Sequence, residues 1–265
     1  MNGDNDARLT FAVGMARRVG ALIRERRVKS DIDVRFKGPQ DYVTEIDEEA
    51  ERVIRQCIST AYPDDAVLGE ELGGTASDAT WVIDPIDGTS NFVRGIPHYA
   101  VSIGFVRDGV PLIGVIYDPE LDLLYSAQHG GGAFCNGHRM SAAANAGLES
   151  AMIEMGCWRR RPPATNFSDA IGRMVHAGLD FRWRGSAALA LADVARGMSD
   201  AFFGLHLNSW DAAAGIVIVR EAGGQTTDFF ANDGLCRGNA LLASGPGVFS
   251  ELSAIAFSQS PTGDL

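Results

Sequence analysis

Two stretches near the N-terminus show the spacing of apolar residues that is typical of amphipathic helices. In the first, about residues 6–29, apolar side chains recur every three or four positions with arginines between them. The second, about residues 44–61, begins at Thr44, a favourable N-cap residue, and carries acidic residues in its first turn. The connecting sequence KGPQDYVT, from Lys37 to Thr44, is rich in residues that interrupt regular structure, so we expect a turn there.

The next part of the chain favours strands. AVLGEE, residues 66–71, and TWVIDP, residues 80–85, contain short apolar runs that lead into carboxylates. Residues 99–128 have the pattern of an antiparallel meander, with turns at Asp108–Gly109 and near Pro119–Glu120. We therefore expect a sheet built largely from consecutive hairpins.

From about residue 140 onward, the pattern changes to strands that alternate with helices. We expect an N-terminal α+β half, residues 1–140, and a C-terminal α/β half, residues 141–265, with a boundary near residues 137–145. The expected strands of the second half are 150–156, 180–185, 200–205 and 240–245, and its expected helices are 167–178, 187–197, 210–224 and 248–257.

Composition and charge narrow the classes of protein to consider. The chain has 265 residues, of which 46% are hydrophobic, so it can bury a large core. The net charge of −11 argues against binding to nucleic acid or to an anionic membrane. Apolar runs stay far below the ~20 residues that cross a bilayer, and the first ten residues lack the pattern of a signal peptide. We therefore expect a cytoplasmic protein without membrane or nucleic-acid partners.

Several common catalytic motifs are missing from the sequence. The four cysteines form no CxxC pair, and HExxH, GxSxG and GxxxxGK[ST] do not occur. This excludes the usual zinc protease, serine hydrolase and P-loop interpretations. The segment HGGGAFCNG, residues 129–137, lacks the GxGxxG spacing of a dinucleotide site, so we expect a structural turn there.

The sequence WVIDPIDGTSNF places two aspartates, Asp84 and Asp87, after a buried strand. Pro85 favours an extended backbone at Asp84, and Gly88 allows the chain to turn. Residues 89–91, Thr-Ser-Asn, are suited to capping a helix that starts there. The aspartates are therefore either turn and capping residues or part of a site beside a helix N-terminus.

Carboxylates at two other places in the sequence favour the second alternative, in which Asp84 and Asp87 are part of a site. Glu70 and Glu71 follow the apolar run AVLG, and Asp211 lies at the start of the apolar helix expected at 210–224. If these groups gather together, they repel one another unless they are protonated or bound to metal. Ligands that are all oxygen and rich in carboxylates suit Mg²⁺ or Mn²⁺.

Taken together, DPIDGTSNF, the upstream GEE and the downstream WDAAAG and EAGG resemble the inositol monophosphatase family of Mg²⁺-dependent, lithium-sensitive phosphatases. The resemblance extends over nearly the whole chain. It implies an α/β (α+β) fold, a layered αβαβα sandwich of the sugar-phosphatase type, and a homodimer. It also implies that residues 1–140 carry metal-binding loops and that residues 141–265 complete the metal and substrate site.

The resemblance further implies a ligand set for two or three Mg²⁺ ions, with Mn²⁺ as an alternative. Glu70, Asp84 and the backbone carbonyl of Ile86 would hold the first ion. Asp84, Asp87 and Asp211 would hold the second, and Glu70 would help to hold a third.

Catalytic and substrate-binding roles follow from the same resemblance. Thr89, supported by Asp47, would orient and deprotonate the attacking water, and Glu70 would act in catalysis through the metal. No phosphoenzyme is expected. Substrate-binding roles are implied for Lys37, Asp87, Gly88, Thr89, Gly185, Ser186 and Ala187.

The chain departs from the family pattern in the substrate pocket. Gly204 stands where inositol-specific relatives carry a glutamate that binds sugar hydroxyls, so we do not expect tight recognition of inositol. In GCWRRR, Trp158 and the arginines at 159–161 either enter the pocket or lie on a solvated loop.

These observations lead to three functional hypotheses. The first is a phosphoric monoester hydrolase that cleaves a small inositol, polyol, sugar or amino-alcohol phosphate with metal-activated water. The second is a 3′-phosphonucleotide phosphatase, although such proteins more often read DPLDGTKEF than DPIDGTSNF. The third is a regulatory protein that acts through protein partners.

Overall fold

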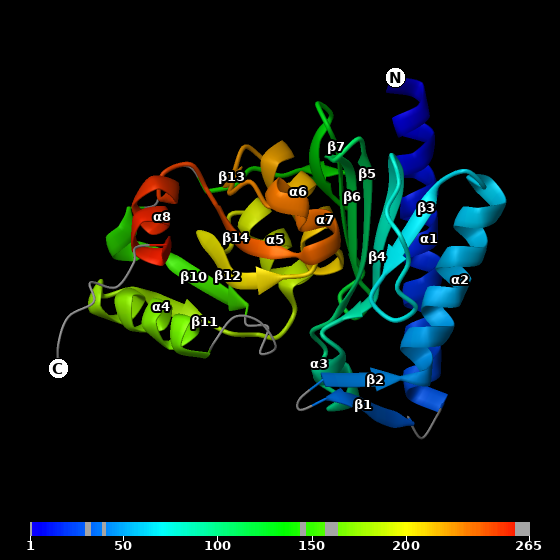
Figure 1. Ribbon diagram of the computed structural model, residues 1–265, viewed down its shortest axis with the longest axis horizontal. Helices are drawn as coiled ribbons and strands as arrows, with labels where there is room; N and C mark the ends of the chain where they lie inside the picture. Colours follow the sequence, from blue (N-terminus) through cyan, green and yellow to red (C-terminus); the bar gives the residue numbers. More distant parts are fainter. Residues whose placement is uncertain (1, 30–32, 39–40, 144–146, 157–163, 258–265) are drawn as a thin grey trace.

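Two long helices cover one face of the larger sheet (Figure 1). The computed structural model describes residues 2–29, 33–38, 41–143, 147–156 and 164–257. The helices are α1 (Asn2–Lys29) and α2 (Glu45–Ala61), and they bury Val19, Ile23 and Ile54 against the sheet.

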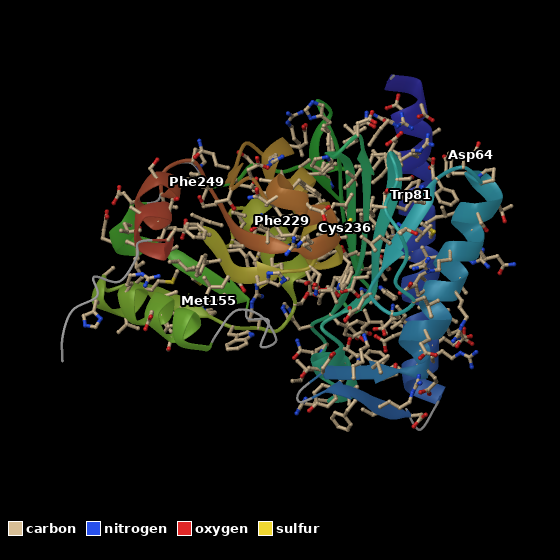
Figure 2. The ribbon with its side chains drawn as sticks, in the orientation of Figure 1. Asp64, Trp81, Met155, Phe229, Cys236 and Phe249 are labelled. Atoms are coloured by element: carbon tan, nitrogen blue, oxygen red, sulfur yellow. The ribbon has the colours of Figure 1, made fainter. Side chains whose placement is uncertain are left out.

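Thr44 caps α2, as predicted, in a reciprocal capping box with Asp47. Trp81 is fully buried where these helices meet the sheet (Figure 2).

The larger sheet has seven strands in the order β3-β4-β5-β6-β7-β8-β9. The predicted meander is confirmed, because all neighbouring strands are antiparallel except the parallel pair β3 and β4. The strands are β3 (Ala66–Gly69), β4 (Ala79–Asp87), β5 (Ala100–Arg107), β6 (Val110–Asp118), β7 (Leu123–Gln128), β8 (Gly132–Cys135) and β9 (His138–Arg139).

Two segments that we expected to be turns contain strands. In residues 129–137, turns at 129–131 and at Asn136–Gly137 flank β8, which pairs with β7 and extends the sheet. In the KGPQDYVT segment, β1 (Val34–Gly38) and β2 (Asp41–Thr44) form an antiparallel hairpin. The predictions missed these strands because turn-forming residues mark the bend of a hairpin as readily as an irregular loop.

The second sheet has five strands in the order β11-β10-β12-β14-β13. Its outer face is covered by α4 (Ala164–His176) and α8 (Phe249–Phe257), which pack on Ile153, Phe203 and Leu242. The strands are β10 (Met152–Gly156), β11 (Asp180–Arg182), β12 (Ala201–Leu207), β13 (Gln225–Thr226) and β14 (Asn239–Ser244). β10 is parallel to β11 and β12, and β14 is antiparallel to β12 and β13.

A central pair of helices lies between the two sheets (Figure 1). These are α5 (Ala187–Ala195) and α6 (Ser209–Glu221), and their side chains share one core with Ile116 of the larger sheet and Phe202 of the smaller one. The predicted αβαβα layering is therefore confirmed. The division into halves at 1–140 and 141–265 stays a prediction.

Short one-turn helices complete the chain. They are α3 (Thr89–Val93), which follows β4, and α7 (Gly234–Arg237), which precedes β14. None of the helices in the described ranges has both the length and the apolar character that crossing a membrane requires.

A pair of glycines lets α6 approach the larger sheet closely. Gly104 on β5 and Gly114 on β6 are cross-strand partners. A Cβ atom at Gly114 would overlap the carbonyl oxygen of Ala214, and one at Gly104 would lie 3.0 Å from the Cβ of Ala213. Side chains at these two positions would therefore push α6 away from the sheet.

We expect Gly114→Ala to lower the free energy of unfolding by about 1–3 kcal/mol or more, because the added methyl group meets backbone atoms rather than a movable side chain. Chemical denaturation with circular dichroism measures this. Gly14→Ala on α1 is the matched control: nothing lies within 4 Å of its Cβ position, so it should stabilise the protein by up to ~1 kcal/mol. Equal stabilities of the two variants would contradict this account of α6.

Candidate functional site

The end of β4 carries the two aspartates of the DPIDGTSNF motif. The pairing of β4 with β5 becomes irregular between Asp84 and Asp87, where Pro85 supplies no N–H donor. The amide of Ile86 donates a 2.9 Å hydrogen bond to Asp84 Oδ1, which holds this bend. Both aspartates are buried, with only 1% and 6% of their surface exposed.

The chain turns from β4 into α3 at Gly88, which has φ = 100°. This left-handed backbone suits glycine, as the sequence indicated. The expectation that Thr89, Ser90 and Asn91 cap a helix was wrong, because Gly88 is itself the N-cap and Thr89 is the first helical residue. The Thr89 hydroxyl instead lies 3.0 Å from the carbonyl oxygen of Ile86.

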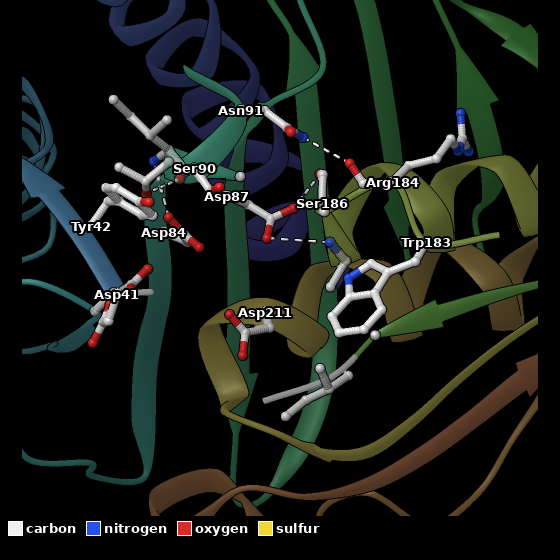
Figure 3. Close-up of a pocket in the computed structure, with 18 of the residues that line it drawn as sticks. Asp41, Tyr42, Asp84, Asp87, Ser90, Asn91, Trp183, Arg184, Ser186 and Asp211 are labelled. Atoms are coloured by element: carbon white, nitrogen blue, oxygen red, sulfur yellow. Dashed lines mark hydrogen bonds between the residues drawn. The ribbon is translucent and has the colours of Figure 1, made fainter. Parts of the chain in front are cut away.

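Three carboxylates from separate parts of the chain converge beside this bend. Glu70 follows β3, Asp84 lies on β4, and Asp211 is in the first turn of α6. One oxygen from each lies within 4.8 Å of the others. Figure 3 shows Asp84 and Asp211 facing the same cavity. The predicted convergence of these segments is therefore present.

Contacts at the start of α6 hold Asp211 in place. Its Oδ2 accepts a 2.8 Å hydrogen bond from the amide of Asn208. Ser102, the cross-strand partner of Asp84, donates a 3.2 Å hydrogen bond to the carbonyl of Trp210. Ser102 of β5 therefore connects the strand that carries Asp84 to the helix turn that carries Asp211.

Burial and mutual repulsion make the charged state of this cluster costly. Burial, followed by repulsion from Glu70, raises the pKa of Asp84 and of Asp211 well above the usual aspartate range. A divalent cation removes this cost, and all-oxygen ligands suit a hard ion such as Mg²⁺. The donor set of Glu70, Asp84 and Asp211 therefore fits such an ion.

Asp87 is held by the N-terminus of α5. Its carboxylate accepts hydrogen bonds from the Ser186 hydroxyl, from the Ala188 amide at 2.8 Å and from the Ala187 amide at 3.3 Å. Burial raises the pKa of Asp87 to about 6, even though these donors oppose the increase. The polar groups of Ser186 and Ala187 that were predicted to serve the substrate thus contact Asp87.

Thr89 and Asp47 are adjacent, as the resemblance implied. Thr89 Oγ1 lies 3.3 Å from Asp47 Oδ1. The Asp47 carboxylate also accepts hydrogen bonds from the amide and hydroxyl of Thr44. Burial raises the pKa of Asp47 to about 7, although the Thr44 donors oppose it. A group with this pKa is suited to accepting a proton near neutral pH.

Lys37 of β1 reaches the glutamates that follow β3. Its Nζ lies 3.3 Å from Glu70 and 2.6 Å from Glu71. Burial alone would lower the pKa of Lys37, but Glu70 and Glu71 outweigh it, so the pKa is raised and the ammonium group stays charged. Burial and repulsion from Glu70 raise the pKa of Glu71 to about 8.

The cluster lies in a cavity of about 530 Å³. Ten of the residues named from the sequence line it: Glu70, Asp84, Ile86, Asp87, Gly88, Thr89, Gly185, Ser186, Ala187 and Asp211. Lys37 and Asp47 are not among the described lining residues; Lys37 contacts Glu70, which lines the cavity, and Asp47 contacts Thr89. Trp158 and the arginines at 159–161 lie outside the described residues.

The sequence analysis assigned no site role to several residues that line the cavity, among them Asn91, Trp183 and Arg184. Asn91 donates 2.8 Å hydrogen bonds to the carbonyls of His98 and Arg184, and so joins the DPIDGTSNF segment to the RGSAAL segment. Trp183 and Arg184 line the cavity. The position of Trp183 and Arg184 directly before Gly185 was the one available signal for them.

Comparisons with known proteins agree with this geometry. A model of the inositol monophosphatase family matches residues 4–261. Nus factor SuhB of Salmonella typhimurium is 39% identical over 251 residues, which cover 93% of this chain and 94% of that protein. The fructose-1,6-bisphosphatase/inositol-1-monophosphatase of Thermotoga maritima is 40% identical over 223 residues, which cover 84% and 85% of the two chains.

Solved structures give the same result for the fold. The crystal structure of the extragenic suppressor protein SuhB from Bartonella henselae has a TM-score of 0.87 and 34% identity, and the match covers 96% of this chain and 100% of that one. The chain therefore belongs to the inositol monophosphatase family.

Proposed function

We propose that the protein is a Mg²⁺-dependent phosphatase that hydrolyses small phosphomonoesters. The observation that carries this proposal is the convergence of Glu70, Asp84 and Asp211, with one oxygen from each within 4.8 Å of the others in a cavity large enough for a small ester. The family is Mg²⁺-dependent, and its members include a protein named for both fructose-1,6-bisphosphatase and inositol-1-monophosphatase activity.

Glu70, Asp84 and the Ile86 carbonyl would hold the first Mg²⁺. Asp84, Asp87 and Asp211 would hold the second, and Glu70 would help to hold a third. When bound, Mg²⁺ lowers the pKa of a coordinated water and offsets the charge of the phosphate. The fold holds one oxygen of each carboxylate within 4.8 Å of the others, which is the kind of preorganisation that a metal site requires.

Thr89 and Asp47 would handle the proton of the attacking water. A hydroxyl group has a single proton, and in this structure Ile86 O, at 3.0 Å, is nearer to Thr89 Oγ1 than Asp47 Oδ1, at 3.3 Å. If the Ile86 carbonyl binds a cation, Thr89 donates to Asp47 instead, and its lone pairs then orient the water. Asp47 becomes the acceptor of the water proton through Thr89.

The remaining features of the proposal come from the family. Gly88, Thr89, Gly185 and Ala187 line the cavity where the phosphate ester would lie, and Lys37 would hold Glu70 in place with a charged contact. Homodimer formation and inhibition by lithium are proposed on the same basis.

The name of one relative supports a second candidate function. The Salmonella typhimurium protein is called Nus factor SuhB, which favours a regulatory role through protein partners. A panel of phosphate esters, assayed for released phosphate at millimolar Mg²⁺, separates the candidates. Hydrolysis of any ester would support phosphatase activity. If no ester is hydrolysed, the regulatory role is the favoured candidate.

Asp84→Asn should lower turnover at least ~100-fold, because a metal site supplies several kcal/mol of transition-state stabilisation and this change removes a central ligand charge. The metal-free variant should unfold no more easily than the wild type, since it loses a buried repulsion. Asp64→Asn, an exposed residue outside the cavity, is the matched control. Near-normal turnover of Asp84→Asn would refute the assignment.

Thr89→Val should lower kcat by ~100-fold or more, because it removes the hydroxyl that links the water to Asp47. Thr89→Ser keeps that hydroxyl and should retain most of the activity. Steady-state kinetics at saturating Mg²⁺ measure both variants, and Mg²⁺ titration should show unchanged affinity. If Thr89→Val is as active as Thr89→Ser, the Thr89 hydroxyl has no role in the mechanism.

Removing the metal should make stability fall as pH rises. A carboxyl group whose pKa is raised by folding binds its proton more tightly in the folded chain, so its contribution to stability is lost as pH rises through the folded pKa. The window runs from the unfolded value of about 4 through about 6 for Asp87 and about 8 for Glu71.

Thermal unfolding in EDTA should therefore show a midpoint that falls from pH 5 to pH 8, and Mg²⁺ should raise the midpoint more at pH 8 than at pH 5. Asp84→Asn, with one buried acid fewer, should flatten the slope measured in EDTA. A midpoint in EDTA that rises across this range would contradict the account of the buried carboxylates.

A further inference from the structure

The β1–β2 hairpin borders the cavity without belonging to either of the larger sheets. Among the residues that the structure describes, its strands pair only with each other, and Figure 1 shows the hairpin beside α3 and one end of α2. Asp41 and Tyr42 of β2 line the cavity. Lys37 of β1 contacts Glu70 of the carboxylate cluster. The hairpin therefore brings three side chains to the site from a peripheral position.

Little apolar burial holds this hairpin in place. Of its described residues, Val43 and Thr44, where β2 meets α2, are the buried ones. Phe36 keeps 65% of its surface exposed and packs on the Tyr42 ring, with the ring centres 5.1 Å apart. A two-stranded hairpin is only marginally stable in water by itself. Contacts with neighbouring elements must therefore fix its position.

Arg94, at the C-terminal end of α3, joins the hairpin to that helix. Its Nη2 donates a 2.8 Å hydrogen bond to the Tyr42 hydroxyl, and its guanidinium carbon lies 5.0 Å from the centre of the Tyr42 ring. Its Nη1 donates a 2.9 Å hydrogen bond to the Ser90 hydroxyl. Figure 3 shows Tyr42 beside Ser90, and both residues line the cavity. One planar guanidinium thus holds β2 against the helix that begins at Thr89.

Ion pairs also tie β1 to the rest of the molecule. Arg35 pairs at 2.7 Å with a glutamate of α2, but this pair is exposed and contributes little. Lys37 pairs with Glu70 and Glu71. A cation bound at Glu70 would compete with Lys37 for that carboxylate and would weaken this tie. The contacts of Arg94 involve hydroxyl groups and an aromatic ring, so cation uptake leaves them intact.

We propose that Arg94 is a positioning residue, which fastens the β1–β2 hairpin to α3 and so keeps Asp41 and Tyr42 at the cavity when a cation occupies the carboxylate cluster. Arg94 is not among the described residues that line the cavity, so it acts through Tyr42 and Ser90. Its effect on catalysis rests on the proposed phosphatase function, whereas its effect on the hairpin does not.

Hydrogen exchange of the β1 and β2 amides, measured by mass spectrometry in EDTA and at saturating Mg²⁺, tests this role without any substrate. Arg94→Ala should raise the exchange rates of these amides about ten-fold, because a hydrogen bond to Tyr42 and the contact with its ring are lost. The increase should be larger at saturating Mg²⁺, where Lys37 holds Glu70 less strongly.

Arg17→Ala is the matched control. Arg17 is an exposed arginine of α1 that also lies over a tyrosine ring, that of Tyr117, and its loss should leave the exchange of β1 and β2 unchanged. Tyr42→Ala completes a double-mutant cycle: if Arg94 and Tyr42 act as one contact, the double variant should exchange little faster than either single variant. Unchanged exchange in Arg94→Ala, or increases that add up in the double variant, would overturn the role of Arg94.

The consequence for catalysis is measured with glycerol 2-phosphate. Arg94→Ala should lower kcat/KM by about two- to ten-fold, since the hairpin is at the cavity in a smaller fraction of the molecules. Mg²⁺ binding, measured by calorimetry without substrate, should be no weaker than in the wild type, because release of the hairpin removes the competing charge of Lys37 from Glu70.

These measurements separate the role of Arg94 from the function of the protein. A weaker affinity for Mg²⁺ in Arg94→Ala would indicate damage to the metal site itself and would overturn the positioning role. A wild-type protein that hydrolyses no ester would overturn the phosphatase proposal, and the exchange rates of β1 and β2 would still decide whether Arg94 fastens the hairpin.

Discussion

The packing of α6 between the two sheets is the constraint on which the site depends. Gly104 and Gly114 present no side chain to Ala213 and Ala214, so α6 packs closely on β5 and β6 and its first turn comes close to the bend at the end of β4. Asp211 enters the cluster because of this approach, and Ser102 holds it there through the carbonyl of Trp210. The chemistry of the site is therefore set by backbone packing in the interior of the molecule.

The same packing holds acidic groups where they repel one another. Asp84 and Asp211 are buried, and burial together with Glu70 shifts both toward the protonated form. A protein without a role for this cluster would gain stability from almost any apolar replacement. The fold instead retains a destabilising arrangement that a divalent cation relieves, which is typical of sites where function opposes stability.

Local signals in the sequence predicted the parts of the structure that depend on neighbouring residues. Thr44 marked the start of α2, and the apolar periodicity placed the helices and the meander. The motif around Asp84 led to the family. Features that depend on distant contacts were not visible: the pairing of Gly104 with Gly114, the bridge made by Asn91, and Trp183 at the cavity. The two hairpins were missed because the composition of a turn does not show whether its flanks pair.

Asp87 has a further consequence for the order in which cations are taken up. Its carboxylate already stabilises the N-terminus of α5 through Ser186 and Ala188. An ion held by Glu70, Asp84 and the Ile86 carbonyl would leave these contacts intact, whereas an ion that requires Asp87 would compete with them for the same oxygens. Successive binding constants should therefore differ, with the weaker step coupled to fraying at the beginning of α5.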